Sequence, residues 1–220
     1  MRAVCSSSGG KDSLLALWHA VRQGVQPATM LTMFDETGLC SRSHGVSRPL
    51  MERQAEELGL ALLAPAASWA DYERVFVQTL RILAESNHRL AIFGDIDLQA
   101  HRDWEERVCQ QAGITPVLPL WQRDRRALAE ESLALGFRAV VVCTDSRYLN
   151  DEFCGREFDT QFLADLPAGV DACGENGEFH TFVYDGPLFR HAVDVQVAGK
   201  EEYIAPPGLG GARYCFARLA

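Results

Sequence analysis

Six residues near the start of the chain, Ser8-Gly9-Gly10-Lys11-Asp12-Ser13, are of types suited to phosphate binding. The two glycines let the backbone approach a ligand closely, Lys11 adds a mobile cation, and the two serines add hydroxyl donors. An apolar run at 3–5 is typical of a buried strand, and apolar residues recur at helical spacing from 14 to 21. A strand-to-helix turn presents unpaired helix amides to an anion. The segment therefore predicts a phosphate-binding loop.

The spacing excludes a Walker A loop, because that pattern needs glycine at position 5, where this chain has Cys5, and Ser or Thr at position 12, where it has Asp12. The six residues instead resemble the PP-loop of the ATP pyrophosphatases. Those enzymes split ATP between the α- and β-phosphates and pass AMP to an oxygen of the substrate.

The pattern around this loop predicts alternating strands and helices. Strands are expected at 3–5, 28–34, 60–64, 90–93 and 115–118, with helices following the phosphate loop, from Ser47 to Gly59, from Asp71, and around 104–112. This alternation predicts an α/β fold with a mostly parallel, Rossmann-like (HUP-type) sheet that has helices on both faces. Ligands bind such sheets at the carboxyl ends of the strands. The loop 8–13, Asp35 and Gly94-Asp95 should meet there.

A second, smaller α+β domain is expected from residue 123 to 220, after an ATP-binding domain at 1–122. A helix should run from Asp124 to Gly136, followed by a strand at 139–143 and a helix that includes Phe158, Phe162 and Leu166. Further strands are expected at 179–184, 192–197 and 213–219, with turns at Asp185-Gly186 and Gly199 and a loop at 205–211.

Composition narrows the class of protein. The 220 residues carry a formal net charge of −9, so a broad nucleic-acid surface is not expected. No apolar run approaches the length of a membrane span, and the first residues do not have a signal-peptide layout. The seven cysteines form no C-x-x-C pair, which argues against a disulfide framework or a zinc knuckle and favours a reducing cytoplasm.

A second polar cluster follows residue 173. Glu175 and Glu178 lie on a loop with two glycines, which suits either a contact to magnesium, ammonium or an amine, or an ordinary surface turn. His180 and His44 are equally ambiguous, since each is either a structural residue or a functional one.

Four stretches together resemble the diphthine–ammonia ligase family in order and spacing. They are SGGKDS from Ser8, GDIDLQAHRDWEERVC from Gly94, LPLWQRD from Leu118 and GENGEFHTFVYDGPLF from Gly174. The resemblance covers nearly the whole chain. It implies a PP-loop enzyme that amidates a carboxylate with ATP and ammonium and releases AMP and pyrophosphate. In archetypal members the carboxylate belongs to diphthine, a modified histidine of a translation elongation factor.

The resemblance also assigns roles to residues. ATP would place its phosphates on Ser8, Gly9, Gly10, Lys11, Asp12 and Ser13, and its adenine near Met33 and Phe34. Gly94 and Asp95 would contact the nucleotide, and Asp12 and Asp95 would be magnesium or ribose contacts. Lys11 and Asp12 would act in catalysis together with Glu175 and Glu178, which would hold ammonium or the acceptor or deprotonate the ammonium. His44, Asn176 and His180 would face the acceptor.

The chain departs from the ligases in the C-terminal loop. They tend to read G-E-G-G-E-Y-E-T, whereas this chain has Asn176 in place of a glycine and His180 in place of a glutamate. The acceptor is therefore either protein-borne diphthine or a different, small-molecule carboxylate. A PP-loop sulfurtransferase acting on tRNA and a non-catalytic ATP sensor are the alternative functions, and assembly into a homo-oligomer is left open.

Overall fold

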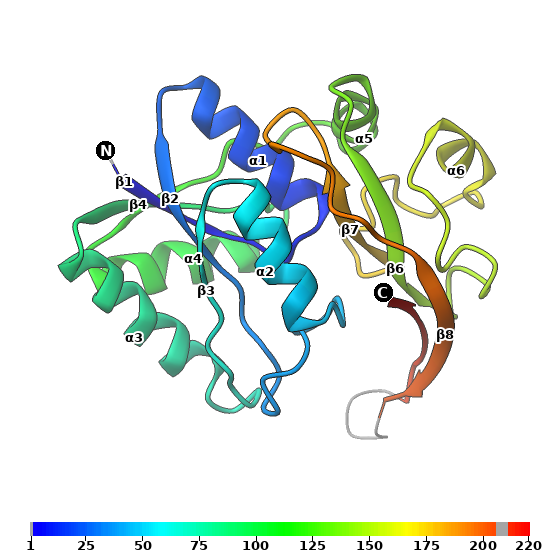
Figure 1. Cartoon of the computed structure of the whole chain (residues 1–220), viewed down its shortest axis with the longest axis horizontal. Helices are drawn as coiled ribbons and strands as arrows, with labels where there is room; N and C mark the ends of the chain where they lie inside the picture. Colours follow the sequence, from blue (N-terminus) through cyan, green and yellow to red (C-terminus); the bar gives the residue numbers. More distant parts are fainter. Residues whose placement is uncertain (1, 206–210) are drawn as a thin grey trace.

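The computed structural model describes residues 2–205 and 211–220. Its N-terminal half contains a five-stranded parallel sheet with the strand order β3-β2-β1-β4-β5 (Figure 1). The strands are β1 (Arg2–Ser6), β2 (Gln26–Leu31), β3 (Ala61–Leu63), β4 (His88–Ile92) and β5 (Thr115–Val117). The sheet order reverses at β1, so the phosphate loop that follows β1 lies at the topological switch point.

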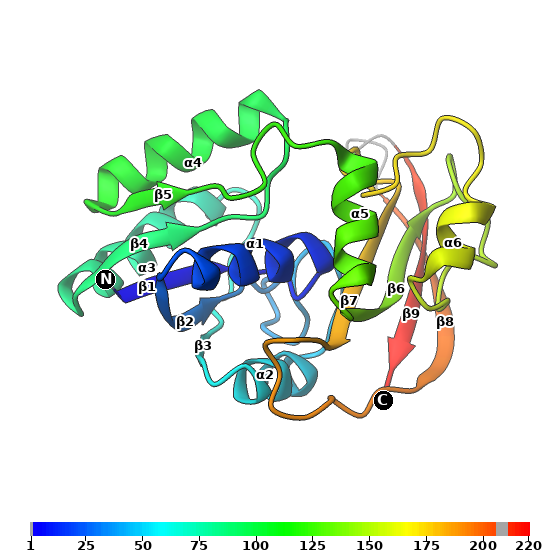
Figure 2. The same cartoon turned by 90° about the horizontal axis from the view of Figure 1, so that it is seen from above.

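Helices cover both faces of this sheet (Figure 2). They are α1 (Lys11–Arg22), α2 (Arg48–Glu57), α3 (Tyr72–Glu85) and α4 (Gln99–Ala112). Alternate residues of β1 point to opposite faces: Cys5 packs in a cluster with Leu14 of α1, and Val4 packs with Phe76 of α3 and Val108 of α4. The prediction of a Rossmann-like α/β fold is confirmed.

The C-terminal half forms an antiparallel sheet with the strand order β7-β6-β9-β8. Its strands are β6 (Arg138–Asp145), β7 (Phe179–Asp185), β8 (Val197–Ile204) and β9 (Arg213–Leu219), and its helices are α5 (Arg125–Ala134) and α6 (Thr160–Asp165). A smaller α+β part after the parallel sheet is therefore confirmed.

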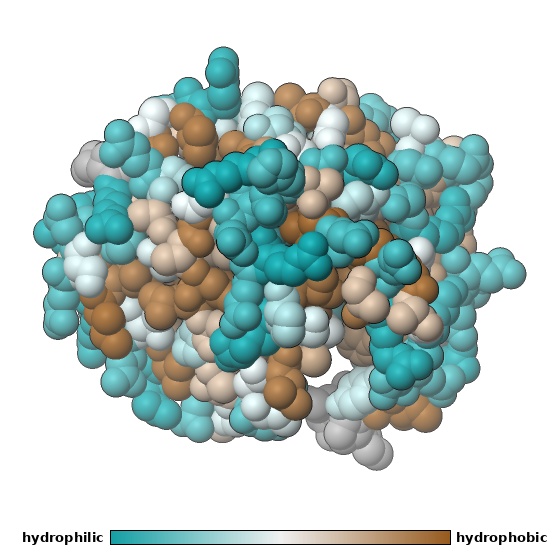
Figure 3. Space-filling model, in the orientation of Figure 1, coloured by the Kyte–Doolittle hydropathy of each residue, from teal (hydrophilic) through white to brown (hydrophobic). Residues whose placement is uncertain are grey.

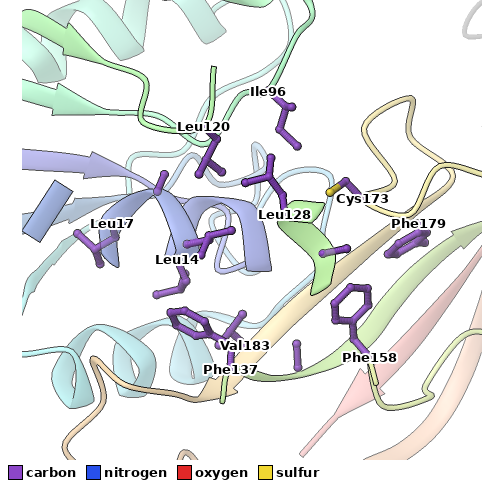
Figure 4. Packing of buried hydrophobic residues seen from close by; sticks show 14 of the residues in the cluster. Leu14, Leu17, Ile96, Leu120, Leu128, Phe137, Phe158, Cys173, Phe179 and Val183 are labelled. Carbon is purple, nitrogen blue, oxygen red and sulfur yellow. The ribbon is translucent and has the colours of Figure 1, made fainter. Parts of the chain in front are cut away.

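One hydrophobic cluster joins the two sheets. Leu14 of α1, Leu128 of α5, and Phe179 and Val183 of β7 belong to it and are almost completely buried (Figure 4). The amide of Val183 also donates to the carbonyl of Gly9 at 2.9 Å. The phosphate loop is thus part of the contact between the two halves, so its shape depends on both of them.

Some predicted elements differ from the structure. The segment 192–197 was expected to be a strand because of its alternating valines, but β8 begins only at Val197. The amides of Val193 and Gln196 donate to carbonyls on two different segments, Tyr184 and Ala220, so no continuous ladder forms. Gly199 lies within β8, beside a register shift, rather than in a turn.

The helix expected to include Phe158 starts later. Phe158 is buried in the shared cluster and precedes α6, whose N-cap is Asp159. Of the loop expected at 205–211, residues 206–210 lie outside the described part of the chain.

Hydrophilic and apolar residues are intermixed over the face shown in Figure 3. In the described part of the chain, no helix has the length and apolar character needed to cross a bilayer. All seven cysteines carry free thiols.

Candidate active site

A cavity of about 500 Å³ opens at the carboxyl ends of β1, β2 and β4 and reaches the second sheet. Its volume lies in the range of small-molecule sites. The residues that sequence analysis selected and that line it are Ser8, Gly10, Lys11, Asp12, Ser13, Met33, His44, Gly94, Asp95, Glu175 and His180. The phosphate loop and the C-terminal loop thus share one cavity.

Close packing explains the glycines at two positions in the wall. A Cβ atom on Gly94 would lie 2.7 Å from the amide nitrogen of Ser13, at the start of α1. A Cβ atom on Gly10 would lie 2.8 Å from Cε1 of His44. Gly9 does not line the cavity: its φ is +83°, and its carbonyl accepts a hydrogen bond from Nε2 of Gln54. Gly9 therefore shapes the phosphate loop.

Lys11 is almost completely buried, and its ammonium lies between the two halves of the chain. It donates to Oδ2 of Asp12 at 2.7 Å and to the carbonyl of Cys173 at 2.5 Å. The rings of Phe158 and Phe179 each lie 5.5 Å from Nζ. Burial opposes the charge, but the neighbouring Asp12 outweighs it, so the pKa of Lys11 is raised. The group remains an ammonium ion at the phosphate loop.

An acidic network forms the wall beside the phosphate loop. Nδ1 of His101 lies 2.7 Å from Oδ1 of Asp95, and the carboxyl of Glu105 is a further acidic neighbour of Asp95 in the same wall. Burial, and then Asp95, raise the pKa of Glu105 to about 11, so Glu105 is a neutral acid. Burial also works to raise the pKa of Asp95, but its neighbours His101 and Glu105 prevail and lower it. Asp95 is thus an anion that pairs with His101.

Glu175 faces the cavity from the C-terminal loop. Its Oε1 accepts a hydrogen bond from the amide of Ile96 at 3.2 Å. Burial, followed by the charge of Asp12, raises the pKa of Glu175 to about 7. A carboxyl group with this pKa can both accept and release a proton near neutral pH.

Glu178 and Asn176 do not line the cavity, contrary to the roles expected for them. The Glu178 carboxylate is buried and accepts from the amides of Asn176 at 3.0 Å and Asp171 at 3.3 Å. The Asn176 side chain donates to Glu178 and accepts from Arg125. The tight turn between the two glutamates directs only Glu175 into the cavity, and Glu178 braces the loop from within.

His44 and His180 form a stacked pair beside Gly10. Their ring centroids are 4.5 Å apart, and Nδ1 of His44 lies 3.0 Å from the carbonyl of Thr181. Burial, and then Lys11, lower the pKa of His180 to about 4, and burial and His180 lower that of His44. Both imidazoles are therefore neutral, and this wall of the cavity carries no charge from them.

The expected adenine contacts divide in the structure. Met33 lines the cavity, but Phe34 does not, because its ring is fully buried with the Arg48 guanidinium 4.5 Å above it. Asp35 also lies outside the cavity, where it accepts from the hydroxyl of Thr37. An aromatic wall that was not anticipated, made of Trp69, Tyr72 and Trp104, stands near Met33.

Sequence reasoning missed other wall residues although a signal was present. His101, Trp104 and Glu105 lie at i, i+3 and i+4 of α4, so they share one helix face, and all three line the cavity. That face follows Gly94-Asp95 directly. Arg42 and Thr181 also line the cavity, but they come from a loop and a strand whose placement only the fold reveals.

The carboxylates in the cavity could contact magnesium, but only together with other ligands such as substrate phosphates. Within residues 2–205 and 211–220, no three His, Cys, Asp or Glu side chains gather as a metal site. Magnesium is commonly held by one or two carboxylates together with substrate phosphates. Asp12, which pairs with Lys11, and Asp95, which pairs with His101, both line the cavity and are about equally exposed, so either carboxylate suits such a contact.

Comparisons with known proteins identify the family of this chain. The diphthamide synthase N-terminal domain matches residues 1–116, and the diphthamide synthase C-terminal domain matches residues 124–207. A diphthine–ammonia ligase of Bos taurus is 33% identical over 222 residues, which cover 89% of this chain and 83% of that protein. One of Mus musculus is 27% identical over 221 residues, with the same coverage of 89% and 83%. Among solved structures, a 4-thiouridine synthetase–RNA complex with bound ATP covers 61% of this chain and 40% of its own, with a TM-score of 0.44 and 16% identity.

The fold, the site and these relatives define the class: the chain is an ATP-dependent ligase that forms an amide, that is, a carbon–nitrogen bond. Within that class, the match of both domains across most of the chain shows that it belongs to the diphthamide synthase family.

Proposed function

We propose that this protein binds ATP and magnesium in the cavity, adenylates a substrate carboxylate and amidates it with ammonia. The observation that carries the proposal is the meeting of the phosphate loop, with Lys11, and the Glu175 carboxyl in one cavity. Residues 1–122 would form the ATP-binding domain and residues 123–220 the acceptor domain. The relatives named diphthine–ammonia ligases support this choice of reaction.

In the first step, a carboxylate oxygen of the acceptor attacks the α-phosphorus, and pyrophosphate leaves. Lys11 and the amides at the start of α1 stabilise the charge that grows on the departing group. Asp12 or Asp95 would hold magnesium together with the phosphates, and the ion would supply further positive charge beside the departing group. The imidazoles of His44 and His180 are neutral, so an acceptor carboxylate that approaches along this wall meets no negative charge from them. The wall around Asp95 is acidic and would repel the same carboxylate.

In the second step, ammonia attacks the acyl carbon, and AMP leaves. Ammonium must first lose a proton, and Glu175 is placed to accept it, with a pKa raised by burial to about 7. A second proton leaves nitrogen when the amide forms. The acidic wall of Asp12, Asp95 and Glu175 favours a small cation, which supports ammonium as the nitrogen source.

Sulfur transfer fits this cavity less well. Cys173 lines the cavity, and its thiol donates a hydrogen bond to the carbonyl of Arg125 at 3.0 Å. Burial raises the pKa of this thiol to about 12, so almost no thiolate nucleophile forms at neutral pH. A sensor that binds ATP without turnover remains the other alternative, and it would release no pyrophosphate.

The test supplies ATP, ¹⁵N-ammonium and, in parallel, an elongation factor carrying diphthine and a set of small carboxylic acids. Wild-type protein is expected to place ¹⁵N in an amide of one acceptor, while Glu175→Gln binds ATP with unchanged affinity but forms the amide far more slowly. Glu152→Gln is the matched control, because Glu152 is exposed and does not line the cavity. ATP cleavage with no ¹⁵N in any acceptor would contradict amidation.

A further inference from the structure

Arg125, the first residue of α5, joins two loops that come from different halves of the chain. Its Nε donates to Oδ2 of Asp97 at 2.8 Å, and its Nη2 donates to the other oxygen of the same carboxylate. Its Nη1 donates to Oδ2 of Asp171 at 2.8 Å and to Oδ1 of Asn176 at 3.3 Å. One guanidinium group thus uses three nitrogens to hold two carboxylates.

Each of these carboxylates belongs to a loop that supplies a cavity residue. Asp97 follows Ile96, whose amide donates to Glu175. The side chain of Asp171 is 8% exposed. Its carboxylate accepts hydrogen bonds from the amide of Glu175 at 2.8 Å and from the amide of Cys173 at 3.0 Å. The contacts form a closed ring: Arg125 holds Asp171, Asp171 holds the Glu175 backbone, Ile96 holds the Glu175 carboxyl, and Asp97 returns to Arg125.

We propose that Arg125 is a positioning residue that keeps the Glu175 carboxyl in the cavity by tying Asp97 to Asp171. The charges around it support this role, because Asp95, Asp97, Asp171 and Glu175 gather where the two loops meet. Without a cation between them, these carboxyl groups would repel one another and separate the loops.

The geometry requires arginine in particular. A guanidinium group presents a rigid fork that can bind one carboxylate with two nitrogens while a third nitrogen reaches another. A lysine ammonium keeps the charge but is a single point on a flexible stem. Arg125→Lys should therefore preserve the fold better than Arg125→Met while still loosening Glu175.

Amide hydrogen exchange measured by NMR tests the clamp without a substrate. In Arg125→Met, the amides of Ile96, Cys173 and Glu175 should exchange at least about tenfold faster than in wild type, with amides of α3 unchanged. Arg125→Lys should show the same pattern more weakly. Arg126→Met is the matched control, because Arg126 is half exposed and pairs with Glu130 one turn along α5. Unchanged exchange at the three amides in folded Arg125→Met or Arg125→Lys would overturn the proposal.

A kinetic readout separates positioning from general stability, and this part rests on the proposed function. Arg125→Lys should raise the KM for ammonium about tenfold while leaving the KM for ATP within about twofold of wild type. Equal changes in both constants would contradict a role through Glu175. If the wild type forms no amide, the proposed function fails, but the exchange measurement still decides whether the clamp exists.

Discussion

The hydroxyl of Thr181 accepts a hydrogen bond from the backbone amide of Lys11 at 3.1 Å, across a sequence separation of 170 residues. The amide belongs to the first residue of α1, and the hydroxyl belongs to β7 of the second sheet. Helix starts are usually capped by a side chain close in sequence. Here the C-terminal sheet supplies the partner, so the two halves of the chain build the phosphate loop together.

Replacing Thr181 with valine tests this link. Thr181→Val keeps the shape but leaves the buried Lys11 amide without its partner, which should cost about 1–3 kcal/mol of unfolding free energy. Thr181→Ser keeps the hydroxyl and should lose clearly less. Urea unfolding of both variants gives the comparison, and equal losses would show that the methyl group, not the hydrogen bond, is what matters.

Alanine at the two cavity glycines should have unequal effects. In Gly10→Ala, the new Cβ meets the tip of the His44 ring, which can shift, and overpacking of this kind costs about 1–3 kcal/mol. In Gly94→Ala, the Cβ meets backbone atoms of Asp12 and Ser13, which cannot shift without moving α1. Thermal unfolding should therefore rank Gly94→Ala as the less stable variant. Adding His44→Ala should restore part of the stability lost in Gly10→Ala but none of that lost in Gly94→Ala.

The rate of amide formation should depend on the protonation of Glu175. Because its pKa is raised to about 7, the carboxyl is protonated below that pH and cannot accept a proton from ammonium. The rate at fixed ammonium concentration should rise with pH and level off above about 7. Glu175→Gln should lose this break. A continued rise well beyond neutral pH would point instead to free ammonia taken directly from solution.

Protein stability should report the low pKa of His180. Its pKa falls from 6.5 to about 4 on folding, so between these pH values the unfolded chain binds the proton and the folded chain does not. The free energy of unfolding therefore has its full value above pH 6.5 and decreases as the pH falls towards 4, by at most about 3 kcal/mol from this group. Compared with His180→Asn, wild type should lose stability between pH 6.5 and 4. Parallel stability curves for the two proteins would contradict a neutral His180 in the folded protein.

The sequence was sufficient for the parts of this molecule that local chemistry determines. The strand-to-helix turn at 8–13 and the alternation of elements around it predicted the parallel sheet and the edge at which ligands bind. The orientation of Glu178 was beyond such reasoning, because a turn pattern does not say which of two nearby carboxylates turns inward. The same holds for Phe34, which follows a cavity residue but points to the core.

Contacts between distant segments were also out of reach. Nothing near Lys11 in the sequence indicates that Thr181 and the carbonyl of Cys173 are its partners. Arg125 follows LPLWQRD directly and lies in the helix predicted from Asp124 to Gly136, but no local pattern assigned it a role. Its link to Asp97 and Asp171 depends on how the two halves pack, which local patterns do not encode.

Product analysis after incubation with ATP, ammonium and an acceptor tests the central claim most directly. AMP and pyrophosphate should form in equal amounts together with the amide, and folded Lys11→Ala, which lacks the ammonium group at the phosphate loop, should show no turnover. ADP and phosphate as the main products, or undiminished turnover in Lys11→Ala, would contradict that claim.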